Sequence, residues 1–270
     1  NRYAQIMLML VPLGLAVAAS ERRAKLRWLA LAATFIAGAG SALAFSRGAA
    51  VGFAAAVLIA ACLGVVSKRQ LLGIGVGALL ILLAIPQYWD RLAAMGDMAG
   101  ALTGRRDARS IGDGAVRGRL TEMGAAALVF FDHPIVGVGP GMFKHHVREY
   151  ADLIGLRALA EDREAHNLYL HIAAEYGLPG IACFLIMVGL ALRRLARMRR
   201  EWLTANPVRA RLATGFLLAL VVYLTTGMFL HFSYARYFWI LLALADAAVF
   251  IAHGCEPKAS TPLEEARSAG

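Results

Sequence analysis

Polar side chains that could do chemistry stand at the borders of apolar stretches in this sequence. Ser46-Arg47 precedes one such stretch and His166-Asn167 precedes another. A helix that begins at either border would present free N–H groups and the positive end of its dipole, and both favour an anion such as phosphate. Arg47 opposes that dipole, so it is better placed to bind an anion than to stabilise the helix. The alternative is an interfacial arginine that reaches towards lipid headgroups.

His166 has the position of a general base. Beside a helix N-terminus the neutral imidazole is favoured, and a neutral ring can accept a proton. Asn167 can cap the helix that follows. His171 and Glu175 lie inside the apolar stretch, where ionisable groups are costly and usually face a cavity. The alternatives are a capping role for His166 and a helix break near Glu175, because the sequence Gly177-Leu178-Pro179-Gly180 predicts a kink.

Two further polar groups belong to the same set. Arg117 and Arg119 begin a stretch with helical apolar spacing, and a solvated helix face is the alternative for both. Tyr234 and Arg236 lie in a short polar turn and could line the same cavity.

The glycine run at 136–141 lacks a following Gly-Lys-Ser/Thr, so it does not predict a nucleotide-binding loop. The three cysteines show no metal-ligand spacing, and helical spacing does not put His145, His146 and Glu149 on one face, so no metal site is expected.

Long apolar runs must position these residues. Of the 270 residues, 59% are hydrophobic, against about 45–50% in soluble domains. The sequence predicts an all-α, polytopic membrane bundle of about seven spans with a long, partly helical extracytoplasmic loop. The seven stretches are Ala4–Ala19, Trp28–Phe45, Gly48–Val66, Leu71–Ile85, Leu168–Leu192, Leu212–Leu230 and Tyr237–Ala252. Because the chain begins with Asn1 rather than Met, we interpret it as a segment of a longer protein in which other spans can precede residue 1.

The distribution of charge predicts the orientation. The net charge is +10, but the loop from Pro86 to Asn167 holds ten Lys/Arg against eleven Asp/Glu. The surplus lies in short segments between spans, thirteen cations on one side and two on the other. By the positive-inside rule the first side is cytoplasmic, and this pattern argues against nucleic-acid binding. The predicted regions are four helices in 1–85, a periplasmic loop in 86–167, three helices in 168–252 and a cytoplasmic tail in 253–270.

The long loop has predicted structure of its own. Its first third, Asp90–Gly114, is rich in Gly, Asp and Arg and is expected to be a tether or lid. An amphipathic helix is predicted over Val116–Phe131, with its apolar face packed on the membrane part. The apolar positions of that face are Val116, Leu120, Met123, Ala127 and Phe131. Asp132-His133-Pro134 ends this helix because proline cannot continue it, and a second helix is predicted over Met142–Leu153.

Three motifs in this order resemble the O-antigen ligase family, within the larger group of O-antigen ligases and polymerases. They are SRGA at Ser46–Ala49, RLTEMGAAALVFFDHPIVGVGPGMF at Arg119–Phe143 and AHNLYLHIAAEYGLPG at Ala165–Gly180. The match covers roughly residues 40–190. Met123-Gly124 departs from the family pattern, which often has a tryptophan and a larger residue there, and this difference concerns packing more than chemistry.

The resemblance implies a membrane glycosyltransferase of the GT-C type. Such an enzyme would move a glycan from an undecaprenyl-pyrophosphate-linked donor to an acceptor hydroxyl, with inversion and without a metal or other cofactor. The family's functional residues fall on Arg47, Arg119 and His166. Substrate contacts are further expected from the neighbouring polar residues, which are Ser46, Arg117, Asn167, Glu175, Tyr234 and Arg236. The implied location is the bacterial inner membrane, with the site facing the periplasm.

The acceptor is open at this stage. In a ligase it would be lipid A–core, in a polymerase of the same group a growing lipid-linked glycan, and in a third variant a protein. From a different class, a polysaccharide transporter would be expected to carry charged residues at mid-membrane depth in several spans. Here the candidate residues collect at one face, which favours an enzyme.

Overall fold

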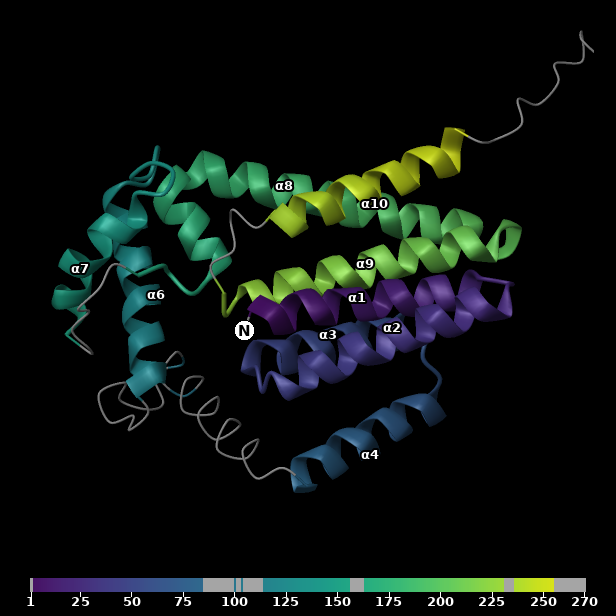
Figure 1. Ribbon diagram of the computed structural model, residues 1–270. Helices are drawn as coiled ribbons and strands as arrows, with labels where there is room; N and C mark the ends of the chain where they lie inside the picture. The colour runs from purple at the N-terminus through teal and green to yellow at the C-terminus, as the bar shows by residue number, and fades with distance from the viewer. Residues whose placement is uncertain are drawn as a thin grey trace, which may run out of the picture.

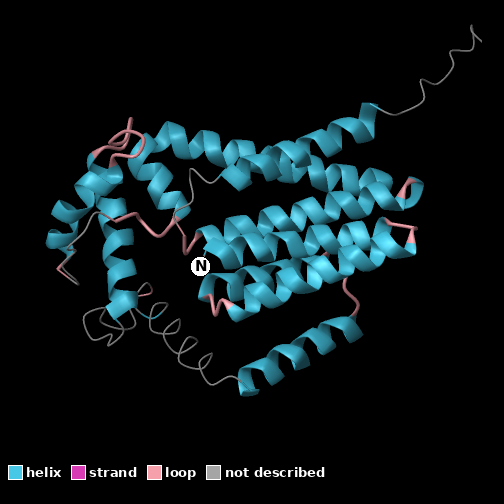
Figure 2. Ribbon diagram, in the orientation of Figure 1, coloured by secondary structure: helices cyan, strands magenta, loops and turns pink. Residues whose placement is uncertain are grey.

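The computed structural model describes residues 2–84, 100, 103, 114–155, 163–230 and 236–254. Every regular element in this part of the chain is an α-helix (Figure 2), which confirms the all-α prediction. The helices are α1 (Arg2–Ser20), α2 (Ala24–Leu43), α3 (Arg47–Cys62), α4 (Lys68–Ala84), α6 (Gly114–Asp132), α7 (Phe143–Ile154), α8 (Leu168–Ala205), α9 (Pro207–Gly227) and α10 (Arg236–Gly254). The predictions for Tyr234, for the tail from residue 255 and for most of the segment 90–113 lie outside the described residues.

The bundle helices lie side by side, with α4 at the outer edge (Figure 1). Four of them, α1, α2, α8 and α9, are long and apolar enough to cross a membrane, so this is a membrane protein. The seven predicted spans are therefore not confirmed. Helix α3 is apolar, but its 16 residues give a length of about 24 Å, short of the about 30 Å of a bilayer core.

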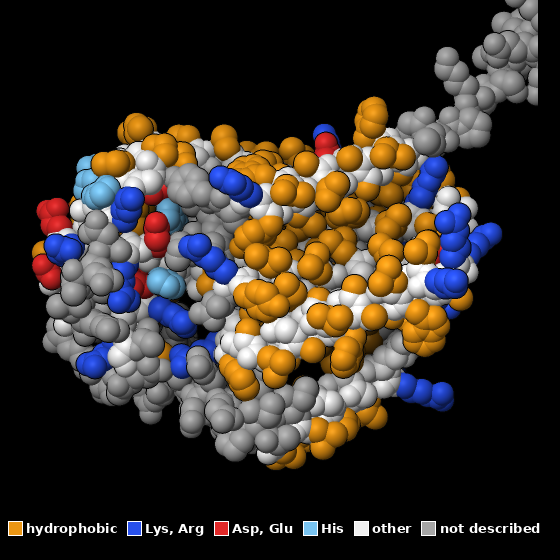
Figure 3. All heavy atoms as spheres, viewed as in Figure 1, with side chains coloured by type: hydrophobic (Ala, Val, Ile, Leu, Met, Phe, Trp, Pro, Cys, Tyr) orange, Lys and Arg blue, Asp and Glu red, His pale blue; other side chains and the backbone are white. Residues whose placement is uncertain are grey.

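The two ends of the bundle differ in charge. The turns α1–α2, α3–α4 and α8–α9 lie together at one end, on the right in Figure 1. The α2–α3 turn, the beginnings of α8 and α10, and helices α6 and α7 lie at the other. Lys and Arg side chains cover the first end, whereas Lys, Arg, Asp, Glu and His mix at the second (Figure 3). We name these the basic end and the site end.

Helix α8 is longer than the predicted span. It continues through Leu192 to Ala205, so the arginine-rich segment predicted as an inter-span connection, Arg193–Arg211, is mostly helix. The reason is local: this segment has good helix formers and no Gly or Pro before Pro207. The turn is reduced to Asn206, whose side-chain Oδ1 accepts from Arg209 N at 3.3 Å and caps α9.

A close glycine contact and a buried hydrogen-bond network connect the bundle helices near the site end. A Cβ built on Gly52 of α3 would lie 2.6 Å from Thr226 Cγ2 of α9. Buried Gln5 of α1 donates to Tyr223 O of α9 at 3.3 Å and accepts from the Tyr237 hydroxyl of α10 at 2.7 Å. These contacts join α1, α3, α9 and α10 near the turn that precedes Arg47.

Helices α6 and α7 pack with the beginning of α8 into a second, separate core, which we call the head region (residues 114–155 and 163–177). Its buried apolar residues are Ala125, Ala126, Val129, Phe143, Val147, Tyr150, Ala151, Ala165 and Ala174. The two predicted helices are confirmed to within two residues. At the end of α6, Asp132 accepts a hydrogen bond from the Tyr150 hydroxyl, which raises the pKa of Tyr150 to about 12.

The predicted packing face of α6 was partly wrong. Val116 and Leu120 are buried, but Phe131 is 72% exposed. Met123 and Ala127 are half-buried, and from Leu120 onward the buried face continues through Glu122, Ala125, Ala126 and Val129. The buried positions hold small side chains because α7 and α8 pack closely against α6. A side chain as large as that of Phe131 would not fit between these helices.

Candidate functional site

The first turn of α3 presents Arg47 at the site end. Phe45 has a left-handed φ of 47°, which turns the chain so that Ser46 Oγ accepts from Ala49 N at 3.4 Å. Helix α3 then begins at Arg47. Its neighbour Gly48 lies against Phe229, where an added Cβ would be 3.3 Å from Phe229 Cβ. The N-terminus of α3 is thus fixed against the segment that follows α9.

The first turn of α8 is built in the same way. His166 also has a φ of 47°, and Asn167 Oδ1 accepts from the backbone N–H groups of Tyr169 and Leu170 at 3.0 and 3.1 Å. Asn167 Nδ2 donates to Met228 O at 3.3 Å. Residues 228 and 229 therefore contact both N-termini, which brings Arg47 and His166 to one neighbourhood. Left-handed conformations in two residues other than glycine cost free energy and are concentrated at functional sites.

His166 contacts a buried carboxylate on α6. Its Nδ1 lies 2.6 Å from Glu122 Oε2 and 3.2 Å from Glu164 O. Both neighbours of Nδ1 are oxygen atoms, so we assign the ring proton to this nitrogen. In a neutral imidazole the lone pair then resides on Nε2. His166 is partly exposed, with 28% of its side chain accessible, so the ring can be reached from outside.

Glu122 is the central residue of the head region that sequence reasoning missed. Its side chain is 1% exposed and also meets Arg163 Nη1 at 3.3 Å. Burying a carboxylate costs free energy unless the charge is paired. The two partners of Glu122, Arg163 and His166, both lie in the segment that precedes α8. Glu122 lies three residues after Arg119 on α6, so both point to the same side of the helix. The available signal was a single carboxylate among the small residues Gly118, Ala125 and Ala126.

A second polar chain lies behind His166. Buried His171 has Glu164 Oε2 at 3.3 Å from Nδ1 and Glu175 Oε1 at 3.1 Å from Nε2. Glu175 is 1% exposed and its Oε1 accepts from Phe143 N at 3.4 Å. Glu164 therefore contacts His166 through its backbone and His171 through its carboxylate. This chain fixes the segment that carries His166.

The predicted kink in α8 is confirmed, and it holds the glycine turn in place. Gly177 has φ 64° and ψ −163° inside the helix, and Pro179 has no N–H. The carbonyls of Ala174 and Glu175, which lose their helical donors, accept instead from Val138 N and Gly139 N, both at 2.9 Å. In the other direction Leu178 N donates to Pro134 O at 2.7 Å.

No side chain fits where these two segments meet. A Cβ on Gly137 would lie 2.4 Å from the carbonyl carbon of Glu175, and one on Gly177 would lie 2.4 Å from Ile135 O. Both glycines have positive φ. The His-Pro-x-x-Gly-x-Gly and Glu-x-Gly-x-x-Gly patterns are thus two halves of one backbone contact.

The predicted site residues that the structure describes lie in four places. Ser46, Arg47, His166 and Asn167 lie around residues 228–229, and Arg117 and Arg119 are half-buried on the helix that supplies Glu122. Glu175 is buried on the far side of His171. Arg236 is exposed at the start of α10, at the same end of the bundle, and Tyr234 is outside the described residues. Within those residues no group of three His, Cys, Asp or Glu side chains is placed to hold a metal ion.

The fold and this site define a helical membrane protein with a basic, histidine-containing site at one end of its bundle. The family model described as O-antigen ligase matches residues 32–185, more than half of the chain and all three motifs. The protein belongs to the O-antigen ligase family, a group of membrane glycosyltransferases of the ligase and polymerase type. The comparison with curated proteins found no match.

Proposed function

We propose that this protein transfers a glycan from an undecaprenyl-pyrophosphate carrier to an acceptor hydroxyl at the periplasmic face of the inner membrane. The observation that carries the proposal is that Met228 and Phe229 contact two turns, the one that follows His166, which is paired with buried Glu122, and the capped N-terminus of α3 that begins at Arg47. The basic turns at the opposite end support the orientation, because cationic loops face the cytoplasm.

In this proposal the donor pyrophosphate binds between α3 and α6. Departure of the pyrophosphate develops negative charge on its oxygens, and Arg47 and Arg119 stabilise that charge. Ser46 and the N–H groups of the first turn of α3 add donors at the same place. Arg117 on α6 and Arg236 at the start of α10 extend the positive surface toward the glycan. This arrangement can stabilise a diphosphate leaving group with protein side chains alone.

His166 acts as the base. Its Nε2 takes the proton of the acceptor hydroxyl as the acceptor oxygen bonds to the anomeric carbon and the bond from that carbon to the pyrophosphate oxygen breaks. One displacement inverts the anomeric centre. Glu122 holds the Nδ1 proton and stabilises the imidazolium that forms. Asn167 fixes the turn, and Glu175 acts as a positioning residue because its contacts are with His171 and Phe143 N.

The role of the arginines is tested in full-length protein reconstituted with a lipid-linked glycan donor. Arg119→Ala should reduce turnover by about 10²- to 10³-fold, as removal of one oxyanion-stabilising donor does, and Arg119→Lys should restore part of it. Lys144→Ala, which removes an exposed cation from α7, is the matched control and should be unaffected. Normal turnover by correctly inserted Arg119→Ala would show that the site is assigned wrongly.

The acceptor is identified by the surface glycans of a deletion strain. Loss of all polymer from lipid A–core indicates the ligase that we propose, acting on lipid A–core. A core that carries single glycan units indicates the polymerase. An unchanged lipopolysaccharide profile directs attention to exopolysaccharide or to glycosylated protein, the remaining alternatives within this family.

A further inference from the structure

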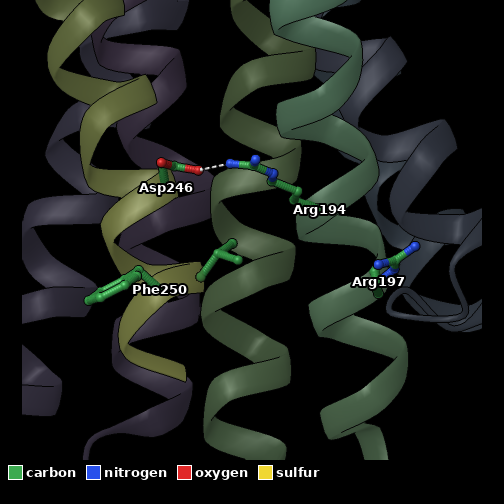
Figure 4. A pocket seen from close by; sticks show the side chains of 5 residues that line it. Arg194, Arg197, Asp246 and Phe250 are labelled. Carbon is green, nitrogen blue, oxygen red and sulfur yellow. Dashed lines mark hydrogen bonds and ion pairs between the residues drawn. The ribbon is translucent and has the colours of Figure 1, made fainter. Parts of the chain in front are cut away.

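A groove with three arginines runs along α8 and reaches α10, beyond the kink of α8 and away from His166. Two adjoining cavities of about 240 and 320 Å³ share Arg194 and Arg197 as lining residues. Leu190 and Arg193 complete one of them, and Asp246, Val249 and Phe250 complete the other. Figure 4 shows Arg194 reaching from α8 to Asp246 of α10, with Arg197 and Phe250 further along the same two helices.

Two arginines of this groove differ from Arg199 and Arg209, which lie closer to the turn between α8 and α9. Arg199 donates to Leu63 O at 2.6 Å, and Arg209 donates to Ala252 O at 2.8 Å. Both thus bind backbone carbonyls at or near the C-terminal ends of helices. Arg193 and Arg197, by contrast, are exposed and make no hydrogen bond or ion pair within the described part of the chain.

The groove therefore carries uncompensated positive charge. The one carboxylate in it, Asp246, is 2.7 Å from Arg194 Nη1, and the two side chains are 60% and 59% exposed. That pair neutralises itself and leaves Arg193 and Arg197 for an external anion. Guanidinium groups match phosphate oxygens in geometry and charge.

The surroundings of these arginines are apolar and face outward. Phe250 is 78% exposed, Ile251 61% and Leu190 50%. Leu190 belongs to α8, one of the four helices long and apolar enough to cross a membrane, so outward-facing apolar side chains on α8 and the adjacent α10 are expected to contact acyl chains. A ligand that fits the groove thus has a phosphate at one end and an acyl chain at the other.

We propose that the groove between α8 and α10 binds one anionic glycerophospholipid of the leaflet at the basic end. Arg193 and Arg197 bind its phosphate, the Arg194–Asp246 pair forms the floor beside it, and an acyl chain lies along Leu190 and Phe250. This site is separate from the transfer reaction, since its residues lie beyond the kink of α8 and in the second half of α10, whereas His166 precedes α8.

The test uses the full-length protein in detergent, with dioleoyl phosphatidylglycerol as the anionic probe and dioleoyl phosphatidylcholine as the neutral one. Phosphatidylglycerol should raise the midpoint of thermal unfolding by about 5 °C relative to phosphatidylcholine, as a saturated ligand site does in a chain of this size. The Arg193→Gln/Arg197→Gln double variant should lose that difference. Arg200→Gln, also exposed on α8 but outside the groove, should keep it.

Two further measurements separate other outcomes. Native mass spectrometry should retain one phosphatidylglycerol per wild-type protein and none on the double variant. Inorganic phosphate at the same concentration should give no stabilisation, because it lacks the acyl chain. The proposal is overturned by equal stabilisation with phosphatidylcholine or inorganic phosphate, by an undiminished phosphatidylglycerol effect in the double variant, or by no effect in the wild type, as when another protein segment occupies the groove.

Discussion

The two ends of the bundle use the same charged residue types for different purposes. At the basic end, Arg199 on α8 and Arg209 on α9 donate to carbonyls near the ends of other helices, Leu63 O and Ala252 O. At the site end, carboxylates are buried and face histidines, as Glu122 faces His166. The first arrangement satisfies backbone groups that a helix end leaves open. The second keeps charge out of water, which costs free energy unless the charge is paired, and such buried charges are concentrated at functional sites.

Backbone conformation follows the same division. Phe45 and His166, the non-glycine residues with positive φ in the described part of the chain, both directly precede the capping residue of a site-end helix. The basic end has a capping asparagine as well, Asn206, but no such residue beside it. The backbone strain of these two positive φ angles lies at Phe45, close to Arg47, and at His166. Such strain is typical of residues whose position serves a function rather than stability.

The largest effect on stability is expected from the backbone contact that is peculiar to the site end. Gly177→Ala adds a Cβ against Ile135 O at a left-handed φ, which combines backbone strain with overpacking and should cost about 3 kcal/mol. Gly189→Ala on the same helix has open space around it and should leave stability unchanged or slightly raised. Thermal unfolding of both variants in detergent checks this, and equal midpoints would show that the kink contact is dispensable.

A large effect on turnover with little effect on stability is expected from Glu122→Gln. The amide cannot hold the imidazolium as a carboxylate does, so part of the general-base contribution is lost and turnover should fall about 10- to 100-fold. The matched control is Glu149→Gln, an exposed position on α7 in the same head region. If the two variants turn over equally fast in the reconstituted assay, Glu122 has only a structural role.

The two capping asparagines give a direct comparison between the ends. Asn167→Ala and Asn206→Ala each remove a helix N-cap and should each cost about 1 kcal/mol of stability. Asn167→Ala should also lower turnover, because it releases the turn beside His166, whereas Asn206→Ala should not. Chemical denaturation and the transfer assay on the same preparations separate the two effects. A similar loss of turnover in both variants would make the effect one of stability alone.

The smallest effect is expected at the basic end. Arg199→Gln removes the donor to Leu63 O and should lower stability by about 1 kcal/mol, as the loss of one hydrogen bond does. Turnover at a temperature well below unfolding should stay at the wild-type level. A marked loss of turnover there would link the basic end to the reaction and break the division between the two ends.

The sequence predicted the positions of the helices better than the contacts between them. Apolar periodicity, Pro134 and Pro179 placed α6, α7 and the kink in α8, because local chemistry decides where helices stop. The buried face of α6 was missed because it depends on how closely α7 and α8 approach, which no local pattern encodes. Glu122 was missed for the same reason: its partner His166 is 44 residues away in the sequence, and only the fold brings them together.

The central claim is that His166, held by Glu122, is the base of a transfer reaction at the site end. The most direct test is the turnover of His166→Ala with a lipid-linked glycan donor in proteoliposomes, beside wild type and Asn206→Ala at equal folded fraction. Turnover of His166→Ala should fall by about 10²- to 10⁴-fold, the contribution of a general base, while Asn206→Ala stays near wild type. Turnover of His166→Ala within a few-fold of wild type would contradict the assignment.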